Sequence, residues 1–420
     1  MAGPVARTDP QPPDVAGTSG PDVRLLLEPS DGLSDLVDSP DALDRAIAAM
    51  GSGAGPIAVD AERASGYRYS QRAHLIQLRR AGSGTVLLDP IALPELGGLA
   101  EVMRPHEWVL HAASQDLPCL AELGLIPERL FDSELAGRLL GYERVGLGTL
   151  VETILRLRLE KGHSAADWSR RPLPEAWLVY AALDVEVLVE LRDHLEDELV
   201  AAGKDEWARQ EFAHVLAQGV RPPVVREEPW RRTSGIHLTR DRRQLAVVRA
   251  LWLQRDEAAR RRDLAPAKLL ADAAIVEAAA RAPATRHDLG QLRGFTGRRG
   301  GRADLGRWWA VLEQTRALPE DELPLVAARG DDGPPPPRTW ERQRPEAAIR
   351  LKRCRAAVLA LATTLQLPPE NLVGPDLVRR LAWTPPEPSP TAVAARLADG
   401  GARPWQVDLV AAPLAGALPG

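Results

Sequence analysis

The segment Ile57-Ala-Val-Asp-Ala-Glu62 decides the fold and holds the first candidate site residues. Its apolar first half predicts a short buried strand over residues 57–59, which delivers Asp60 at its end. Asp60 and Glu62 are two residues apart, so in an extended backbone both carboxylates point to the same face. Such a pair can share a metal ion or bridge two of them. The alternative for Asp60 is a turn residue that closes a strand.

The segments on either side predict an α/β domain. An amphipathic helix over residues 41–50 is expected before the central segment. Further strands are expected at residues 74–78, 85–88 and 108–111, with a hairpin turn at 82–84. Helices follow between residues 132 and 199, one of them over 176–191. Sequential strands followed by helices imply a mixed sheet.

Three later residues complete the candidate site. Asp116 follows the expected strand at 108–111 and begins a helix, which it could also simply cap. Tyr180 and Asp184 are four residues apart on an expected helix and therefore share one face. Their alternative roles are a half-buried core aromatic and a surface acid. Four carboxylates and a phenol are the groups needed to hold two divalent cations and direct a water molecule at a phosphodiester.

The length and composition favour a soluble protein of several domains. A chain of 420 residues, 45% of them hydrophobic, is long enough for two or three domains. It has no apolar stretch near the ~20 residues that cross a bilayer. Its first 24 residues lack the basic start and apolar core of a secretory signal. Cys119 and Cys354 lie too far apart to suggest a disulfide framework or a zinc site. We therefore expect a cytoplasmic protein with no membrane partner.

Arginine is distributed unevenly along the chain. The net charge of −5 alone argues against a nucleic-acid partner, but residues 226–262 hold eleven arginines against five acids. Arg298, Arg299 and Arg302 lie in a glycine-rich stretch and are candidate contacts for nucleic-acid phosphates, independent of sequence. The alternative is that arginine serves as the ordinary surface cation in place of lysine, which occurs only at positions 161, 204, 268 and 352.

These residues belong to a longer pattern that resembles the ribonuclease D family of the DEDDy 3′–5′ exonuclease superfamily. The resemblance covers roughly residues 25–320 and implies an RNase H-like 3′–5′ exonuclease domain. The segment after Pro229-Trp-Arg-Arg232 resembles the helicase-and-RNase-D C-terminal (HRDC) domain, and residues 341–411 look like a second, more diverged copy. The matching stretches of the exonuclease part are Ile57–Glu62, His74–Leu78, Leu88–Pro90, His111–Leu117, Phe131–Ser133, Asp167–Leu173 and Tyr180–Val185.

Domain boundaries follow from this resemblance and from composition. We expect an α/β domain followed by two small all-α domains of the HRDC type. The expected parts are a disordered tail at 1–24, the exonuclease domain at 25–215, a linker at 216–237, an HRDC domain at 238–320, a proline-rich linker at 321–340 and a second HRDC-like domain at 341–415. Their helices are expected at 241–260, 267–282, 286–292, 306–315, 346–365, 371–381 and 391–399.

The resemblance also implies a chemistry. Asp60, Glu62, Asp116 and Asp184 would hold two divalent cations, Mg²⁺ or Mn²⁺, and Tyr180 would orient the attacking water molecule. The implied reaction is the two-metal hydrolysis of RNA from its 3′ end, with release of 5′-mononucleotides. The implied substrates are tRNA precursors and other small structured RNAs, and we expect a monomer.

Other positions in the family pattern have less defined roles. Gln77 and His111 contact either the terminal nucleotide or buried backbone groups, and we favour the second role for both. Lys161 meets either a phosphate or only solvent. Asp132 is expected to cap a helix or support the site without binding a metal. Arg63 stands where the family usually has a bulky apolar residue, and this departure concerns the shape of the substrate channel, not the reaction.

Two other functions fit the same residues. A DNA 3′–5′ exonuclease keeps the chemistry and changes the substrate, because recognition of the 2′-hydroxyl depends on pocket contacts that the sequence does not show. A non-catalytic RNA-binding scaffold would use the helical domains alone. The intact set of acids argues against the scaffold, since an idle site would be free to lose one of them.

Overall fold

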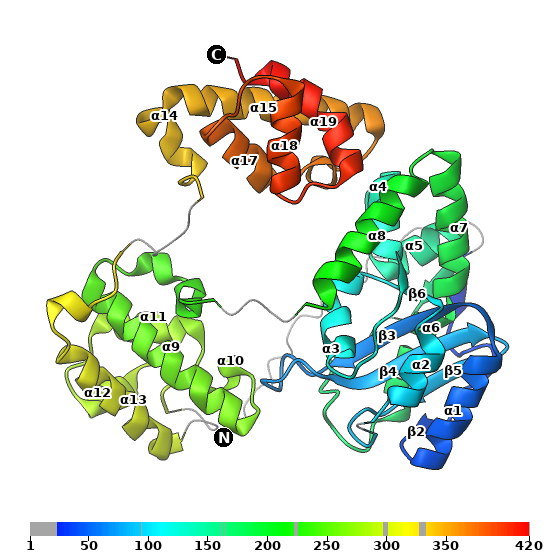
Figure 1. Cartoon of the computed structure of the whole chain (residues 1–420). Helices are drawn as coiled ribbons and strands as arrows, with labels where there is room; N and C mark the ends of the chain where they lie inside the picture. The colour runs from blue at the N-terminus through cyan, green and yellow to red at the C-terminus, as the bar shows by residue number, and fades with distance from the viewer. Residues whose placement is uncertain are drawn as a thin grey trace, which may run out of the picture.

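Three parts follow one another along the chain (Figure 1). We call them the α/β domain (residues 23–221), the middle helical domain (226–326) and the C-terminal bundle (333–419). Among the helices that the structure describes, none is both long and apolar enough to cross a membrane. The computed structural model describes residues 23–93, 95–160, 162–163, 165–221, 226–296, 301–326 and 333–419, and of residues 301–303 it describes the backbone alone.

A six-stranded sheet forms the centre of the α/β domain, with its strands in the order β2-β5-β4-β3-β6-β7. β3, β4 and β5 pair antiparallel, whereas β2 with β5, β3 with β6 and β6 with β7 pair parallel, which confirms the predicted mixed sheet. A separate parallel pair joins β1 to β8. The strands are β1 Arg24–Leu26, β2 Leu36–Val37, β3 Ala54–Arg63, β4 Ala73–Ala81, β5 Gly84–Leu88, β6 Glu107–Leu110, β7 Arg129–Asp132 and β8 Leu157–Leu159.

The strand β3 is longer than the strand predicted over residues 57–59. Its pairing with β4 continues through Asp60, which lies opposite Gln77. Asp60 therefore lies inside β3, because backbone pairing with β4 extends the strand past the apolar residues. The prediction that Asp60 ends the strand is wrong. The register becomes irregular only before the last residue of the strand, Arg63.

Alternation along β4 gives the sheet two different faces. Ile76 and Leu78 point into the main core together with Met50 of α1, whereas Leu75 points into a smaller core with Ala181 of α6. Helix α6 therefore covers the second face, where it contacts β3, β4 and β5. The helices of this domain are α1 Pro40–Ser52, α2 Gly97–Met103, α3 Leu117–Ala121, α4 Ser133–Leu140, α5 Leu147–Ile154, α6 Glu175–Glu186, α7 Leu188–Ala201 and α8 Asp205–Gly219, with a 3-10 turn η1 at Ala113–Gln115.

The single helix predicted over residues 176–191 is two helices, α6 and α7. The break falls at Val187, whose backbone has φ −100° and ψ −8° and leaves the α-helical path. The Val187 side chain is nevertheless buried, so the apolar pattern continues across the break and hides it from sequence inspection. The break lets α6 cover the sheet while α7 turns to pack on α4.

The middle helical domain has a core of its own. Trp230, Leu251, Ile275 and Phe295 meet in it together with Trp308. The predicted helix at 267–282 is two helices, because the backbone of Leu270 is extended and separates them. The helices are α9 Arg242–Arg262, α10 Pro266–Leu269, α11 Asp272–Arg281, α12 Arg286–Gln291 and α13 Gly301–Arg316, with 3-10 turns at Pro229–Arg232, Ile236–Leu238 and Glu320–Glu322.

The C-terminal bundle contains a last helix that was not predicted. The expected helices stop at residue 399, but α19 (Pro404–Ala417) follows a short connection and packs on α15 and α18. Its buried residues belong to the same continuous core as those of the α/β domain. The other helices are α14 Trp340–Gln343, α15 Pro345–Leu365, α16 Pro369–Leu372, α17 Pro375–Trp383 and α18 Pro390–Asp399, preceded by a 3-10 turn at Pro337–Thr339.

Candidate active site

Three carboxylates from two elements meet on the α6 side of the sheet. Asp60 and Glu62 come from β3, Asp184 comes from α6, and one oxygen of each lies within 4.8 Å of the others. Because side chains alternate along a strand, Asp60 and Glu62 face the same way, towards the helix that covers this face. The structure therefore brings together three of the four predicted metal ligands.

Burial raises the pKa of each of these acids, and repulsion by neighbouring acids adds to the rise for Glu62 and Asp184. Burial is the main cause for Asp60, whose pKa rises to about 6. Burial also dominates for Glu62, whose pKa rises to about 9 because Asp60, Asp184 and Asp116 add their negative charges. The pKa of Asp184 is raised well above its ordinary value by burial and by Asp60. Acids this crowded resist ionising together, and a bound cation relieves that repulsion.

Asp116, the fourth predicted ligand, belongs to the same electrostatic cluster. It directly precedes α3, as predicted, and is almost fully buried. Its pKa is raised well above the ordinary value by burial and by the charge of Asp60. The Asp116 side chain makes no capping hydrogen bond to α3, so the helix-cap alternative does not describe its position. The side chain is thus available to a ligand of the cluster.

Asp132 shapes the loop that carries Asp116. Its carboxylate accepts hydrogen bonds from the backbone amides of Ala112, at 3.1 Å, and Ala113, at 2.9 Å. The same carboxylate caps α4 through the amides of Glu134 and Leu135. Because it satisfies four backbone donors, Asp132 has the supporting and capping role expected from the sequence.

Tyr180 lies one helical turn before Asp184 on α6. Burial raises the pKa of Tyr180 well above the ordinary value, and the charges of Asp184 and Glu62 add to that rise. The phenol donates a hydrogen bond to Asp184, which lowers the pKa of that acid slightly against the larger effect of burial. The Tyr180 hydroxyl is therefore a protonated donor at the edge of the carboxylate cluster.

Arg63 adds a positive charge that sequence inspection did not place here. Its Nη2 atom lies 3.4 Å from Oδ1 of Asp116. The arginine charge partly offsets the rise in the pKa of Asp60, Glu62 and Asp116. In the sequence, Arg63 was notable only because the family usually has an apolar residue after Glu62. That departure did not indicate where the arginine side chain would point.

Gln77 and His111 are both buried beside the cluster. Gln77 lies across the β3–β4 ladder from Asp60, with its side chain fully covered. His111 Nδ1 lies 2.9 Å from the hydroxyl of Ser133 at the start of α4. Burial lowers the pKa of His111 to about 4, so the ring is neutral at physiological pH. The amide atoms of the Gln77 side chain have no hydrogen-bond partner, and His111 contacts a side-chain hydroxyl, so the expected role of satisfying buried backbone groups stays a prediction for both.

Several predicted nucleic-acid contacts cannot be placed. Lys161, Arg298 and Arg299 lie outside the residues that the structure describes, and the Arg302 side chain is likewise outside them although its backbone belongs to α13. Their roles stay predictions from the sequence.

A loop that leaves the end of β3 joins the α/β domain to the middle helical domain. We call residues 64–70 the junction loop. Asp263 Oδ1, at the C-terminal end of α9, accepts hydrogen bonds from the amides of Tyr69, at 3.2 Å, and Ser70, at 3.0 Å. The Tyr69 hydroxyl donates to Asp256 of the same helix at 3.0 Å. The middle helical domain therefore holds the segment that directly follows β3, the strand of Asp60 and Glu62.

Three further contacts hold the junction loop. Lys268 Nζ lies 3.8 Å from the centre of the Tyr67 ring, and the backbone amide of Ala265 donates to the Tyr67 carbonyl. Arg68 Nε donates to the Ser169 hydroxyl at 2.8 Å, in the segment that leads into α6. We call this whole set of contacts the middle junction.

The C-terminal bundle contacts the α/β domain through α8. Trp405 stacks on Trp207 with ring centres 4.9 Å apart, and its indole N–H donates to Glu211 at 2.8 Å. Arg403 forms an ion pair with the same carboxylate at 2.6 Å. Lys204 Nζ donates to the carbonyls of Leu139 and Leu365, one on each side. We call these contacts the C-terminal junction.

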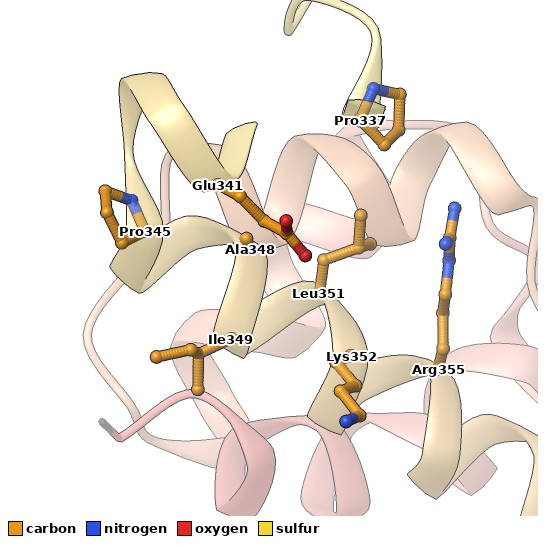
Figure 2. A pocket seen from close by; sticks show the side chains of 8 residues that line it. All are labelled: Pro337, Glu341, Pro345, Ala348, Ile349, Leu351, Lys352 and Arg355. Carbon is orange, nitrogen blue, oxygen red and sulfur yellow. The ribbon is translucent and has the colours of Figure 1, made fainter. Parts of the chain in front are cut away.

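An open hollow of about 510 Å³ lies away from the carboxylates, on the C-terminal bundle. Figure 2 shows side chains of α14 and α15 around it, among them Glu341, Ile349, Lys352 and Arg355. It holds one acid and two cations, and it lacks a cluster of metal-ligating groups among the described residues. We assign it no chemistry.

Comparison with protein families divides the chain in the same way. Residues 35–200 match the model of a 3′–5′ exonuclease, and residues 244–300 match the HRDC domain. Residues 333–418 match the model described as a 3′ to 5′ exonuclease C-terminal domain. The second HRDC-like copy expected at 341–415 stays a prediction.

Curated relatives include proteins called ribonuclease D. One from Acidiphilium cryptum is 36% identical over 234 residues, which are 54% of this chain and 58% of that protein. One from Gluconacetobacter diazotrophicus is 33% identical over 290 residues, 67% of this chain and 71% of that protein. The chain thus spans little more than half the length of some of these relatives.

Solved structures resemble the whole chain. A protein from Bifidobacterium adolescentis is 40% identical, with a TM-score of 0.87 over 95% of this chain and 100% of that one. Escherichia coli RNase D, described as an exoribonuclease involved in structured RNA processing, is 25% identical with a TM-score of 0.67 over 91% of this chain and 98% of that one. The fold and the order of the three parts are therefore shared with known proteins.

Proposed function

The chain belongs to the ribonuclease D family, and from that premise we propose that it removes nucleotides hydrolytically from the 3′ end of RNA. The observation that supports this proposal most is the approach of Asp60, Glu62 and Asp184, whose oxygens lie within 4.8 Å of one another. Such a crowded cluster of half-buried acids is unfavourable by itself and is expected where charged ligands compensate it.

The donor set fits two divalent cations, Mg²⁺ or Mn²⁺. Asp60, Glu62, Asp116 and Asp184 offer carboxylate oxygens, which are the ligands that these hard cations prefer. When bound, the cations would stabilise negative charge on the phosphate and make a water molecule more acidic. The chain would contribute the arrangement of β3 and α6, which brings Asp60, Glu62 and Asp184 together, and Asp116 before α3, whose pKa responds to Asp60.

Tyr180 orients the water molecule and does not remove its proton. Burial keeps the phenol protonated at neutral pH, so its oxygen can accept a hydrogen bond from the water while its proton is donated to Asp184. Its bond to Asp184 holds the hydroxyl at the cluster. A hydroxyl oxygen fixed in this way would accept a hydrogen bond from the water and keep it in line with the bond that breaks, which lowers the entropic part of the barrier.

The substrates we propose are tRNA precursors and other small structured RNAs, with 5′-mononucleotides as products. The similarity to an exoribonuclease of structured RNA processing supports RNA as the substrate class. We propose that arginines of the middle helical domain contact the RNA backbone, which would make binding sensitive to salt.

The test compares one 3′-tailed RNA with DNA of the same sequence, each labelled at the 5′ end. The wild-type protein should shorten the RNA stepwise with Mg²⁺ or Mn²⁺ and not with EDTA. Asp60→Asn should lower the rate at least ~100-fold, because removal of one charge weakens the whole metal site. Glu101→Gln, which changes an exposed acid on α2, serves as the matched control and should leave the rate unchanged.

The outcomes separate three functions. Loss of RNA shortening in EDTA and in Asp60→Asn supports the exoribonuclease. Equal or faster shortening of DNA would show a DNA exonuclease with the same site. Salt-sensitive RNA binding without shortening of either strand would show a binding scaffold and would overturn the proposal.

A further inference from the structure

Arg63 places a permanent positive charge among the carboxylates. Its guanidinium lies 3.4 Å from Asp116, and its side chain is 26% exposed whereas that of Asp116 is only 9% exposed. The arginine can therefore be reached from solvent while it neutralises a carboxylate that is nearly covered. A guanidinium stays charged at any pH at which the protein is folded.

The position of Arg63 depends on an irregularity in the sheet. Glu62 pairs with Leu75, but Arg63 pairs with Ala73, so one residue of β4 has no partner on β3. Strict alternation would direct Arg63 to the face opposite that of Glu62. A bulge increases the local twist and redirects side chains, and bulges are frequent beside active sites. The pairing of β3 with β4 is thus irregular at Arg63, whose guanidinium lies beside Asp116.

The charges of the site show why a further cation is useful there. Two divalent cations would balance the four carboxylates of Asp60, Glu62, Asp116 and Asp184. Arg63 would then be an uncompensated positive charge, and it would match the single negative charge of a phosphodiester. Its partner Asp116 would meanwhile be engaged with a cation, which releases the guanidinium from the ion pair.

We propose that Arg63 exchanges partners, as the counter-ion of Asp116 in the cation-free site and as a donor to the phosphate of the 3′-terminal nucleotide in the loaded site. The identity of that phosphate rests on the proposed exonuclease function. Arginine suits this role because its planar fork can donate two parallel hydrogen bonds to phosphate oxygens. Lysine would supply the charge without the fork.

The two roles predict opposite effects of one substitution. Arg63→Gln removes a competitor for Asp116, so the variant should bind Mn²⁺ about two- to fivefold more tightly than the wild type does, the range typical of a partly exposed ion pair. The same variant loses a charge-assisted contact, so it should bind adenosine 5′-monophosphate about 10- to 100-fold more weakly once saturated with Mn²⁺. Titration calorimetry on the full chain measures both affinities without any hydrolysis.

Two further variants control the experiment. Arg63→Lys should keep the Mn²⁺ affinity of the wild type and recover part of the nucleotide affinity. Arg129→Gln removes an exposed arginine from the opposite end of the sheet, at the start of β7, and should change neither affinity. Thermal melts followed by circular dichroism check that each variant is folded.

Two results would overturn the inference. Weaker Mn²⁺ binding by Arg63→Gln would mean that the arginine only positions Asp116. Unchanged nucleotide affinity would mean that it never meets the phosphate. The proposed function fails separately: if the wild type does not shorten RNA but the two affinities shift in opposite directions, Arg63 is a phosphate donor in a site with a different substrate.

Discussion

The two helical parts are attached to the α/β domain in contrasting ways. At the C-terminal junction, apolar residues of the bundle and of the α/β domain form one continuous core, and Trp405 stacks on Trp207 inside it. At the middle junction, hydrogen bonds and ion pairs between a loop and the end of α9, such as those of Asp263, accompany one small apolar cluster, in which Tyr69 packs on Ala258, Ala259 and Leu269. The middle helical domain keeps a separate core.

The two kinds of contact imply that the C-terminal bundle is firmly attached to the α/β domain and that the middle helical domain is attached more weakly. Apolar burial scales with area and is insensitive to salt, so the C-terminal bundle should unfold together with the α/β domain. Polar contacts at a partly exposed loop are individually weak. They attach the middle helical domain beside the end of β3, which carries Asp60 and Glu62, so a small change in the free energy of this attachment can alter the site.

The largest effect is expected from Trp405→Ala. The side chain is nearly fully buried, and its loss leaves a cavity and removes a hydrogen bond to Glu211. The free energy of unfolding should fall by about 3–5 kcal/mol, as it does when other buried aromatic residues are replaced by alanine. Urea unfolding followed by fluorescence and by circular dichroism measures this. Trp309→Ala, in the middle helical domain, is the control variant. If the bundle and the α/β domain of the wild type unfold in separate transitions, the two parts do not share one core and the contrast between the junctions is wrong.

A smaller and more local effect is expected from Asp263→Ala. The variant leaves the amides of Tyr69 and Ser70 without their acceptor, which costs about 1–3 kcal/mol locally. Hydrogen exchange in the junction loop should accelerate while the melting temperature of the α/β domain stays nearly constant. Asp263 has φ 44°, a conformation that asparagine tolerates. Asp263→Asn should therefore retain much of the protection, and equal acceleration in both variants would contradict this account.

Acid should weaken the middle junction selectively. Burial raises the pKa of Asp263, but hydrogen bonds from Ser70 and the charge of Arg68 outweigh it and hold the pKa below its ordinary value. A depressed pKa gives a contribution that is complete above the unfolded value of about 3.9 and is lost as the pH falls through the folded value. Small-angle scattering between pH 5 and pH 3 should show the middle domain separating. The Asp263→Asn variant should lack this transition.

Salt should have the smallest effect. At about 1 M NaCl, the contacts of Lys268 with Tyr67 and of Arg68 with Asp263 are screened, and we expect a loss below ~1 kcal/mol at the middle junction. Exchange rates in the junction loop should rise slightly, and those in α8 should not change. An equal response in α8 would show that the two junctions do not differ in kind.

Local periodicity predicts which acids share a face within one element, and the resemblance to the ribonuclease D family predicts that the separate elements meet. A period of two puts Asp60 and Glu62 on one face of β3, and a spacing of four puts Tyr180 and Asp184 on one face of α6. The residue types alone then indicated a cation site. The structure confirms the mixed sheet and places these side chains together.

The remaining features depend on information that is not local. The direction of Arg63 is set by a bulge that involves the partner strand β4. The bond between Tyr69 and Asp263 joins residues 194 positions apart. Helix α19 was not among the expected helices, which stop at residue 399, although Pro404 stands in its first turn, where proline commonly begins a helix.

The scarcity of lysine gives the unaltered chain two built-in chemical probes. Of its four lysines, Lys204 is enclosed at the C-terminal junction and Lys268 lies over an aromatic ring at the middle junction. Burial lowers the pKa of Lys204, yet an acylating reagent can reach that amine only when the bundle separates. The acylation rate of Lys204, read by mass spectrometry, therefore reports the opening of the C-terminal junction, and that of Lys268 reports the loss of its contact with Tyr67.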